Sequence, residues 1–214
     1  MLLDKKDAKN RIEIYIAPLP QGSPSGEIHP KERDDEIKSV SNERQRREKF
    51  FVWKLLEYAL QQSLGLGIEQ VRLKKQNGKW VSDTVEISLS HSKEALAVAL
   101  SGAPVGVDIE SAADIDREGV AKRFFTEGEL CKYASSPPEK REESFLRIWT
   151  AKEAIFKSRA QMAFIPSSID TSDVTAYTSC VAIEGVPYVL SAFSEALSEV
   201  AVYTVKSEDI LKNL

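Results

Sequence analysis

The chain is organised around one stretch of ten residues, Arg147-Ile148-Trp149-Thr150-Ala151-Lys152-Glu153-Ala154-Ile155-Phe156. Apolar residues recur here at intervals of three and four, which predicts an amphipathic helix. At about 100° per residue, Glu153 lies roughly 40° from Trp149 and therefore inside the apolar arc. Lys152 falls inside the same arc on its other side. Buried charges are rare unless they are paired or bound to a ligand, so both mark a candidate site. The structural alternative is that these long side chains extend past the core to solvent.

A second acidic site lies upstream, in Val105-Gly106-Val107-Asp108-Ile109-Glu110. The alternation predicts a strand whose apolar residues face the core, with Gly106, Asp108 and Glu110 on the opposite face. The two carboxylates stand roughly 7 Å apart along such a strand, within reach of one cation. Oxygen ligands of this kind favour Mg²⁺ over Zn²⁺. Gly106 is expected to leave room for a ligand. The structural alternative is a solvated acidic strand end.

The composition limits the classes of protein to consider. The chain has 214 residues, 42% of them hydrophobic, and a net charge of −4. It can form one large domain or two small halves, and without a basic excess we expect no nucleic-acid or membrane partner. Cys131 and Cys180 form no C-x-x-C pair, which favours a reduced, cytoplasmic protein. The charged stretch 4–7 contains no signal core, and no run approaches the ~18 apolar residues of a membrane span.

The remaining pattern predicts strands around a long helix, twice over. A helix is expected from an N-cap at Ser41 to about residue 64, a second from the Thr126/Glu129 capping box, and a third from Pro137 to about Ser158. Strands are expected at 12–16, 68–74, 85–90, 95–101, 105–110, 174–183, 186–193 and 199–205, with turns at Asn77-Gly78 and Glu184-Gly185 and a loop at 20–36. The predicted class is α+β, with two similar α/β halves related by a pseudo-twofold axis. Each half is a long helix on a small, mostly antiparallel sheet, and the halves span residues 1–103 and 104–214.

Two further features admit two interpretations each. The helix at 41–64 begins with a basic run that is either a solvated face or a phosphate site, since clustered Arg and Lys suit phosphate groups; its members are Arg44, Arg46, Arg47 and Lys49. His91, flanked by Ser90 and Ser92 at a strand end, is either a structural hydrogen-bonding residue or a phosphate donor.

Taken in order, these motifs resemble the signature of the 4′-phosphopantetheinyl transferases. The similar blocks are Val105–Glu110, Phe124-Phe125, and Trp149–Ala154 with Lys157 one turn on. The block Ser88-Leu89-Ser90-His91-Ser92 is similar to the Ser-His-Ser block of the surfactin-type, pseudo-dimeric group. The Arg47–Lys54 region and Asn77-Gly78-Lys79 are similar to that group's basic helix and Gly-Lys turn. Where the family usually has Pro after this turn, the chain has Trp80.

The resemblance implies an activity. The protein is expected to transfer 4′-phosphopantetheine from coenzyme A to a serine of an acyl or peptidyl carrier protein, releasing adenosine 3′,5′-bisphosphate. Mg²⁺ is the implied cofactor. The pathway is open among fatty-acid, polyketide and nonribosomal-peptide biosynthesis. Because both halves lie in one chain, we expect a monomer with its active site at the seam between the halves.

The resemblance also implies roles for individual residues. Asp108, Glu110 and Glu153 are expected to bind Mg²⁺, and the general base is either Glu153 or a metal-bound water. Lys157, either alone or together with Lys152, is expected to neutralise the transferring phosphoryl group. The implied coenzyme contacts are Arg47, Lys54, Lys79, Ser90, His91 and Lys152. The implied carrier dock is Arg117, Lys122, Arg123, Phe124 and Phe125, with core packing as the alternative for at least one Phe.

Two other classes of function have to be weighed. A coenzyme-A-binding homologue without activity could serve as a scaffold or regulator, but it has no need of three converging carboxylates. An Mg²⁺-dependent pyrophosphate hydrolase would share the carboxylates and lack the carrier dock.

Overall fold

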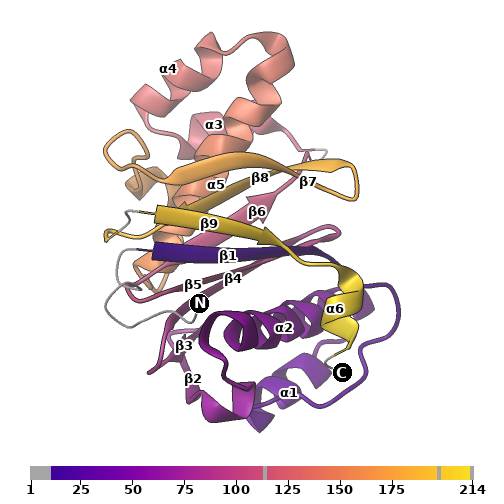
Figure 1. Cartoon of the computed structure of the whole chain (residues 1–214). Coiled ribbons are helices and arrows are strands. Elements are labelled where there is room, and N and C mark those ends of the chain that lie inside the picture. Colours follow the sequence, from indigo (N-terminus) through magenta and orange to yellow (C-terminus); the bar gives the residue numbers. More distant parts are fainter. Residues whose placement is uncertain (1–10, 113–114, 197–198, 213–214) are drawn as a thin grey trace.

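A computed structural model of the chain describes residues 11–112, 115–196 and 199–212 (Figure 1). The charged stretch 4–7 lies outside these ranges. The strands form the middle of the molecule, and the long helices α2 and α5 lie on opposite sides of them. The α+β prediction is therefore confirmed.

The first sheet has four strands in the order β4-β5-β1-β9. Their bounds are Arg11–Pro18 for β1, Glu86–Ser92 for β4, Ala95–Ser101 for β5 and Glu199–Thr204 for β9. Strand β1 pairs antiparallel with β5, where Ile14 stands opposite Ala99, and parallel with β9, where Ile14 stands opposite Val202. The sheet is therefore mostly antiparallel, as predicted, with its parallel pair formed by the most distant segments of the chain.

The second sheet has three antiparallel strands in the order β6-β8-β7, namely β6 (Gly106–Glu110), β7 (Tyr177–Ile183) and β8 (Val186–Phe193). Its hairpin turns at Glu184-Gly185, where both residues have positive φ. A separate hairpin, β2 (Leu73–Gln76) and β3 (Lys79–Ser82), turns at Asn77-Gly78. Both predicted turns are confirmed. The strand predicted at 68–74 is partly wrong, because Ile68–Gln70 form a 3₁₀ turn, η2.

Each sheet carries one long helix. Helix α2 (Glu43–Leu64) is capped by the side chain of Asn42, one residue after the predicted cap, and ends at Gly65 with φ 67°. It buries an apolar face against one side of the first sheet. Helix α5 (Arg141–Ser158) follows a 3₁₀ turn at Pro138–Lys140, η3, and packs on β6 and β8.

The shorter helices differ from the prediction in two places. Part of the predicted loop 20–36 is helix α1 (Lys31–Lys38), whose Arg33 and Ile37 are buried. Helix α3 (Arg117–Phe124) was not predicted, because Ala121 is its one buried residue and its apolar period is weak. Helix α4 (Glu127–Ser135) begins at the predicted capping box.

Alternation along β1 divides the core. Tyr15 and Ala17 belong to the cluster with α2, whereas Ile12, Ile14 and Ile16 belong to a cluster shared with β6 and β8. The two sheets therefore meet through apolar side chains. The predicted boundary at 103/104 falls between β5 and β6. However, β9 and helix α6 (Ser207–Leu211) return to the first sheet, and Ile210 joins the α2 cluster.

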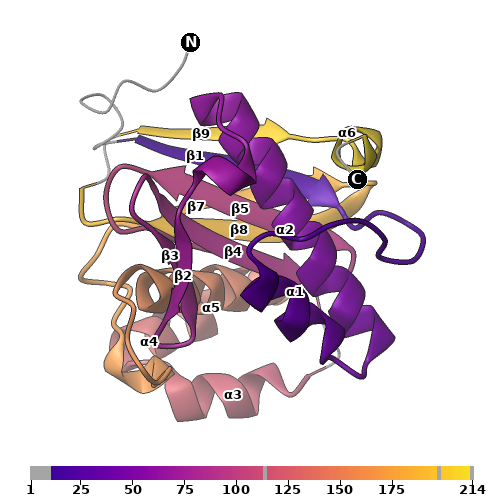
Figure 2. The same cartoon turned by 90° about the horizontal axis from the view of Figure 1, so that it is seen from below.

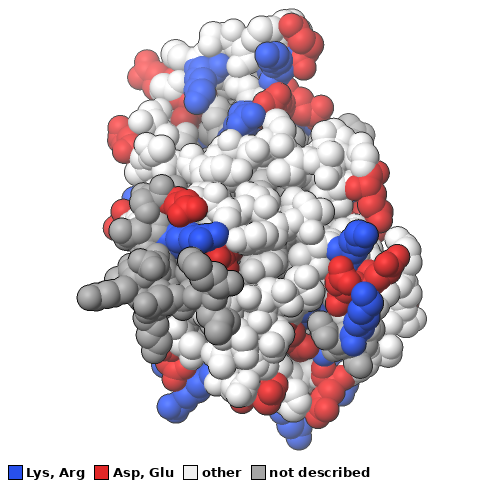
Figure 3. All heavy atoms as spheres, in the orientation of Figure 1, with Lys and Arg blue, Asp and Glu red and all other residues white. Residues whose placement is uncertain are grey.

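The surface view gives no sign of a basic face over the strands. On the side seen in Figure 3, residues other than Lys, Arg, Asp and Glu cover most of the middle of the molecule, and the charged residues, of both signs, lie toward its top, bottom and edges. Within the described ranges, no helix combines the length and the apolar character needed to cross a membrane.

Candidate functional site

The candidate site is built where β6 lies directly against α5. A Cβ atom on Gly106 would stand 1.8 Å from the carbonyl oxygen of Ala154 and 2.6 Å from the backbone nitrogen of Ser158. The prediction that Gly106 leaves room for a ligand is therefore wrong, because the backbone of α5 occupies that space. The close approach brings the acidic residues of β6 beside Glu153 and Lys157.

The ammonium group of Lys157 lies among these carboxylates. Its Nζ atom is 2.6 Å from Oδ1 of Asp108, which is 2% exposed, and 3.6 Å from Oε2 of Glu153. It also donates to Oγ of Ser90 and to the carbonyl oxygen of Val107, both at 3.1 Å. One lysine thus joins the strand and the helix at the site.

Burial and like charges alter the pKa values of the site. Burial first, and then the neighbouring Asp108, raise the pKa of Glu153 to about 7. The same two causes raise the pKa of Glu110. Burial alone would lower the pKa of Lys157, but Asp108 and Glu153 raise it above its ordinary value. The cluster therefore carries excess negative charge, which Lys157 balances in part.

As the side chains stand, no three His, Cys, Asp or Glu residues of the described ranges are arranged to hold a metal ion. The donor chemistry nevertheless fits a hard cation, since the site offers carboxylate oxygens. Oδ2 of Asp108 is buried and accepts no hydrogen bond from a nitrogen or hydroxyl group of the residues that the structure describes. A buried carboxylate oxygen without a partner is unfavourable, so this atom has capacity for a further cation or donor.

Three serines of β4 link the first sheet to this site. Ser88 accepts from the backbone nitrogen of Val107 at 3.0 Å. Ser90 donates to Oδ1 of Asp108 at 2.7 Å, and Ser92 donates to Oε2 of Glu110 at 2.5 Å. The contacts of Ser88 and Ser92 were not predicted. The sequence signal was present, because both strands alternate with a period of two.

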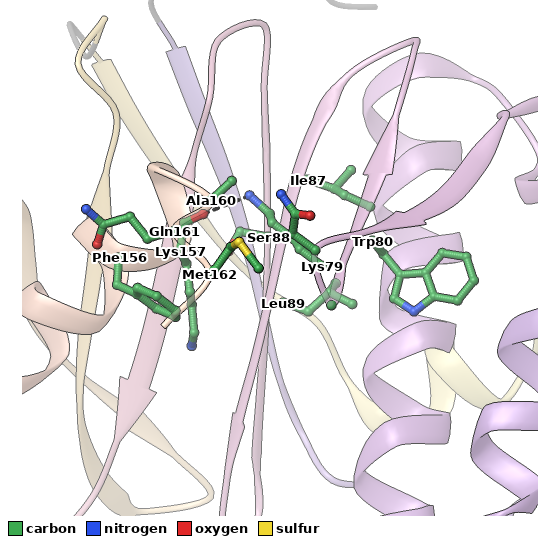
Figure 4. A pocket seen from close by; sticks show the side chains of 12 residues that line it. Lys79, Trp80, Ile87, Ser88, Leu89, Phe156, Lys157, Ala160, Gln161 and Met162 are labelled. Atoms are coloured by element: carbon green, nitrogen blue, oxygen red, sulfur yellow. Dashed lines mark hydrogen bonds between the residues drawn. The ribbon is translucent and has the colours of Figure 1, made fainter. Parts of the chain in front are cut away.

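A cavity of about 360 Å³ opens between the β2–β3 hairpin and the end of α5 (Figure 4). Lys79 and Trp80 line it from the hairpin, and Phe156, Lys157 and Met162 line it from α5 and the following turn. Figure 2 shows the hairpin beside α2, extending toward α5. The cavity therefore lies at the seam between the two sheet-and-helix units, next to Lys157.

Two predicted coenzyme residues lie along this seam. Nζ of Lys79 donates to the carbonyl oxygens of Lys157 at 2.9 Å and Val105 at 3.3 Å, and burial lowers its pKa. His91 is partly exposed, with Nδ1 3.4 Å from Oε2 of Glu48. Burial lowers the pKa of His91, although the neighbouring Glu48 carboxylate acts in the opposite direction.

The prediction that Lys152 binds coenzyme or phosphate is wrong. Its side chain is fully buried and Nζ lies 2.6 Å from Oε2 of Glu129, which is 1% exposed. Nζ also donates to the carbonyl oxygens of Pro166, at 3.0 Å, and Ile169. Lys152 is a structural residue that fastens α4 and the 166–169 segment to α5.

Two basic residues of α2 also have other partners. Lys54 is 4% exposed and donates to the carbonyl oxygen of Glu27 at 2.6 Å and to Oε2 of Glu57 at 2.9 Å, so its predicted coenzyme contact is wrong. Arg47 is partly exposed and donates to the carbonyl oxygen of Pro20 at 3.0 Å. Its coenzyme contact stays a prediction.

The predicted aromatic pair divides between core and surface. Phe125 is 6% exposed and its ring stacks on that of Phe145 with centroids 5.3 Å apart, which confirms core packing for this residue. Phe124 instead lines a second cavity of about 280 Å³, together with Trp149 and Glu110. Apolar surface therefore adjoins the carboxylates on the side of α3.

Part of the chain is similar in sequence to known proteins. Residues 104–183 match the family model described as the 4′-phosphopantetheinyl transferase superfamily. The chain is 30% identical over 159 residues to 4′-phosphopantetheinyl transferase psf-1 of Bacillus pumilus, covering 72% of this chain and 58% of that protein. It is 33% identical over 114 residues to 4′-phosphopantetheinyl transferase gsp of Aneurinibacillus migulanus, covering 52% of this chain and 48% of the relative. These alignments thus span about half the length of the curated relatives.

The matched region contains the residues that form the acidic site. Asp108 and Glu110 on β6, and Glu153 and Lys157 on α5, all lie within residues 104–183. The resemblance predicted from the sequence motifs is confirmed. The part of the chain that contains the acidic site is therefore similar to the 4′-phosphopantetheinyl transferase superfamily.

Proposed function

We propose that the protein transfers the 4′-phosphopantetheine group of coenzyme A to a serine hydroxyl of a carrier protein. The observation that carries this proposal is the cluster of Asp108, Glu110, Glu153 and Lys157 beside the seam cavity, inside the region that matches the family. Phosphoryl transfer requires positioned charge more than covalent chemistry, and this cluster supplies charge of both signs.

The coenzyme is assigned to the seam cavity. Lys79 and Lys157 bring two cations to its wall, where they suit the phosphates of the coenzyme. The apolar side chains of Trp80, Phe156 and Met162 give the wall a surface for an adenine ring or the pantetheine arm. His91 and Arg47 remain candidates for contacts with the coenzyme phosphates.

Asp108, Glu110 and Glu153 would hold Mg²⁺, as their oxygen chemistry allows. Bound there, the cation would neutralise charge on the pyrophosphate of the coenzyme.

The residues of the chain supply the remaining steps. Glu153, with a pKa of about 7, is suited to accept the proton of the carrier serine as its oxygen attacks the phosphorus. The bond from that phosphorus to the adenosine-bearing phosphate breaks, and adenosine 3′,5′-bisphosphate leaves. Lys157 neutralises charge that develops on the transferring group.

The partners and setting follow from this activity. The carrier protein is assigned to the side of α3, where Phe124 and Trp149 line the second cavity beside Glu110. Because one chain contributes every residue of the cluster, we propose a monomer. The two cysteines, Cys131 and Cys180, are both unpaired, which supports a cytoplasmic location.

One mass measurement tests the activity. The protein is incubated with an apo carrier protein, coenzyme A and Mg²⁺, and the mass of the carrier is recorded. A gain equal to one phosphopantetheine supports the proposal. Coenzyme binding without a gain supports the scaffold, and coenzyme cleavage without a gain supports the hydrolase.

A variant pair assigns the activity to the cluster. Asp108→Asn is expected to abolish transfer while the protein stays folded. Asp173→Asn, at an exposed carboxylate, is the matched control and is expected to transfer at the wild-type rate. Equal rates for both variants would overturn the assignment of the site.

A further inference from the structure

We infer that Ser90 and Ser92 are positioning residues, which hold one oxygen of each of the carboxylates of Asp108 and Glu110 from across the seam and thereby restrict how these side chains can turn toward a divalent cation. The inference rests on the proposed function and deepens it, because it assigns a role to β4 in a site otherwise formed by β6 and α5.

The two strands involved belong to different sheets and lie side by side. Side chains therefore make the polar connections between them. Residues two apart share one face of a strand, so Ser88, Ser90 and Ser92 all point the same way along β4. Ser90 and Ser92 each donate a hydroxyl hydrogen to a carboxylate. The Oγ atom of Ser90 is 2.7 Å from Oδ1 of Asp108, and that of Ser92 is 2.5 Å from Oε2 of Glu110.

The hydrogen-bonding capacity of Ser90 is fully used at this position. A hydroxyl donates one hydrogen bond, and that of Ser90 goes to Asp108. Its oxygen accepts from Nζ of Lys157 at 3.1 Å and from the backbone nitrogen of Ile109 at 3.4 Å. Ser90 is also buried, with 6% exposure. Its one hydroxyl hydrogen is directed at Asp108, and its coenzyme contact stays a prediction.

The orientation of Asp108 shows what this contact achieves. Ser90 and Lys157 hold its Oδ1 atom, while the buried Oδ2 atom accepts no hydrogen bond from a nitrogen or hydroxyl group of the described residues. One oxygen is therefore fixed by two donors, and the other faces neither Ser90 nor Lys157. Ser92 fixes Oε2 of Glu110 in the same way. A metal-binding side chain is oriented by hydrogen bonds to those of its atoms that do not touch the metal. Loss of such a hydrogen bond typically lowers metal affinity by about 10–100-fold.

The decisive experiment measures cation binding directly. Mn²⁺ is titrated into the full chain without coenzyme, by calorimetry and by electron paramagnetic resonance of the free ion. We expect Ser90→Ala and Ser92→Ala each to weaken Mn²⁺ binding by about 10-fold or more. Ser92→Thr, which keeps the hydroxyl, is expected to restore most of the affinity.

Ser88→Ala is the matched control. It removes a seam hydrogen bond from the same face of β4, but Ser88 bonds to a backbone nitrogen and not to a carboxylate. We expect its Mn²⁺ affinity to stay within about twofold of wild type, because the carboxylates keep their partners. Chemical denaturation of each variant confirms that the comparison is between folded proteins.

The outcomes separate this inference from the proposed function. If the wild type binds Mn²⁺ and Ser92→Ala binds it equally well, the positioning role is wrong and the metal assignment stands. If Ser88→Ala weakens Mn²⁺ binding as much as Ser92→Ala does, the serines affect binding by holding β4 and β6 together and not by orienting the carboxylates, and the inference is again wrong. If the wild type binds no Mn²⁺, the metal assignment of the proposed function fails and takes the inference with it.

Discussion

Replacing Lys152 by Met tests whether this lysine is structural. Met keeps the length of the side chain but removes the charge, so Glu129 is left as a buried carboxylate without its cation. Breaking a buried pair in this way typically costs about 3–5 kcal/mol. Glu129 keeps hydrogen bonds from the backbone nitrogens of Thr126 and Thr171 and from the Thr171 hydroxyl. These contacts favour the lower end of the range, so we expect a loss of about 3 kcal/mol.

The loss is measured as the free energy of unfolding in urea at pH 7. Lys132→Met, at an exposed lysine of α4, is the control and should change stability by less than about 0.5 kcal/mol. Adding Glu129→Gln to Lys152→Met removes the uncompensated charge and is expected to recover part of the loss. At a temperature where Lys152→Met is folded, transfer should continue. A folded variant of wild-type stability that has lost transfer would show that Lys152 contacts the coenzyme after all.

Three further predictions follow from other sites. Gly106→Ala should destabilise the protein by about 3 kcal/mol or more in urea unfolding, because its Cβ collides with the Ala154 carbonyl; wild-type stability would refute the close approach. Glu36→Gln should cost about 2–3 kcal/mol at pH 7. Partial burial raises the pKa of Glu36, but Arg33 and three hydrogen bonds outweigh it and lower the pKa to about 2. Since the folded pKa lies below the unfolded value, this stability is present above about pH 5 and is lost as the pH falls toward 2; a difference from wild type that stays constant over that range would contradict it. His91→Ala should weaken coenzyme binding about 5–10-fold by calorimetry; an effect on the maximal rate alone would exclude a phosphate contact.

Local signals in the sequence were sufficient for most of the fold. The capping box at Thr126, the turns at Asn77-Gly78 and Glu184-Gly185, and the alternation along β6 all depend on neighbouring residues, and the structure confirms them. Helix α3 was not predicted, because Ala121 is its one buried residue and its sequence therefore shows almost no helical periodicity of apolar residues. Pairing of β9 with β1 could not be predicted, because no local pattern specifies a partner so distant in sequence.

In the candidate site too, local sequence patterns predicted some features, whereas others depend on contacts between distant segments. Helical geometry predicted that Lys152 and Glu153 both lie inside an apolar arc. Lys152 is fully buried, whereas the Glu153 side chain is 25% exposed. The helical angle alone also does not show which residue each of them contacts. Lys152 meets Glu129, whereas Glu153 meets Lys157 and the β6 carboxylates. The role of Gly106 was misjudged for a similar reason, since small size allows close approach by either a ligand or a backbone. Only the packing of α5 on β6 decides between them.

The return of β9 to β1 has a consequence for how the protein is made. During synthesis on the ribosome, β1 emerges early, but its parallel neighbour is not available until residues 199–204 have been translated. Until then, one edge of β1 is open to pairing with other chains. Contacts of such long sequence separation also slow folding. We therefore expect the first sheet to be completed last, although its strand β1 is synthesised first.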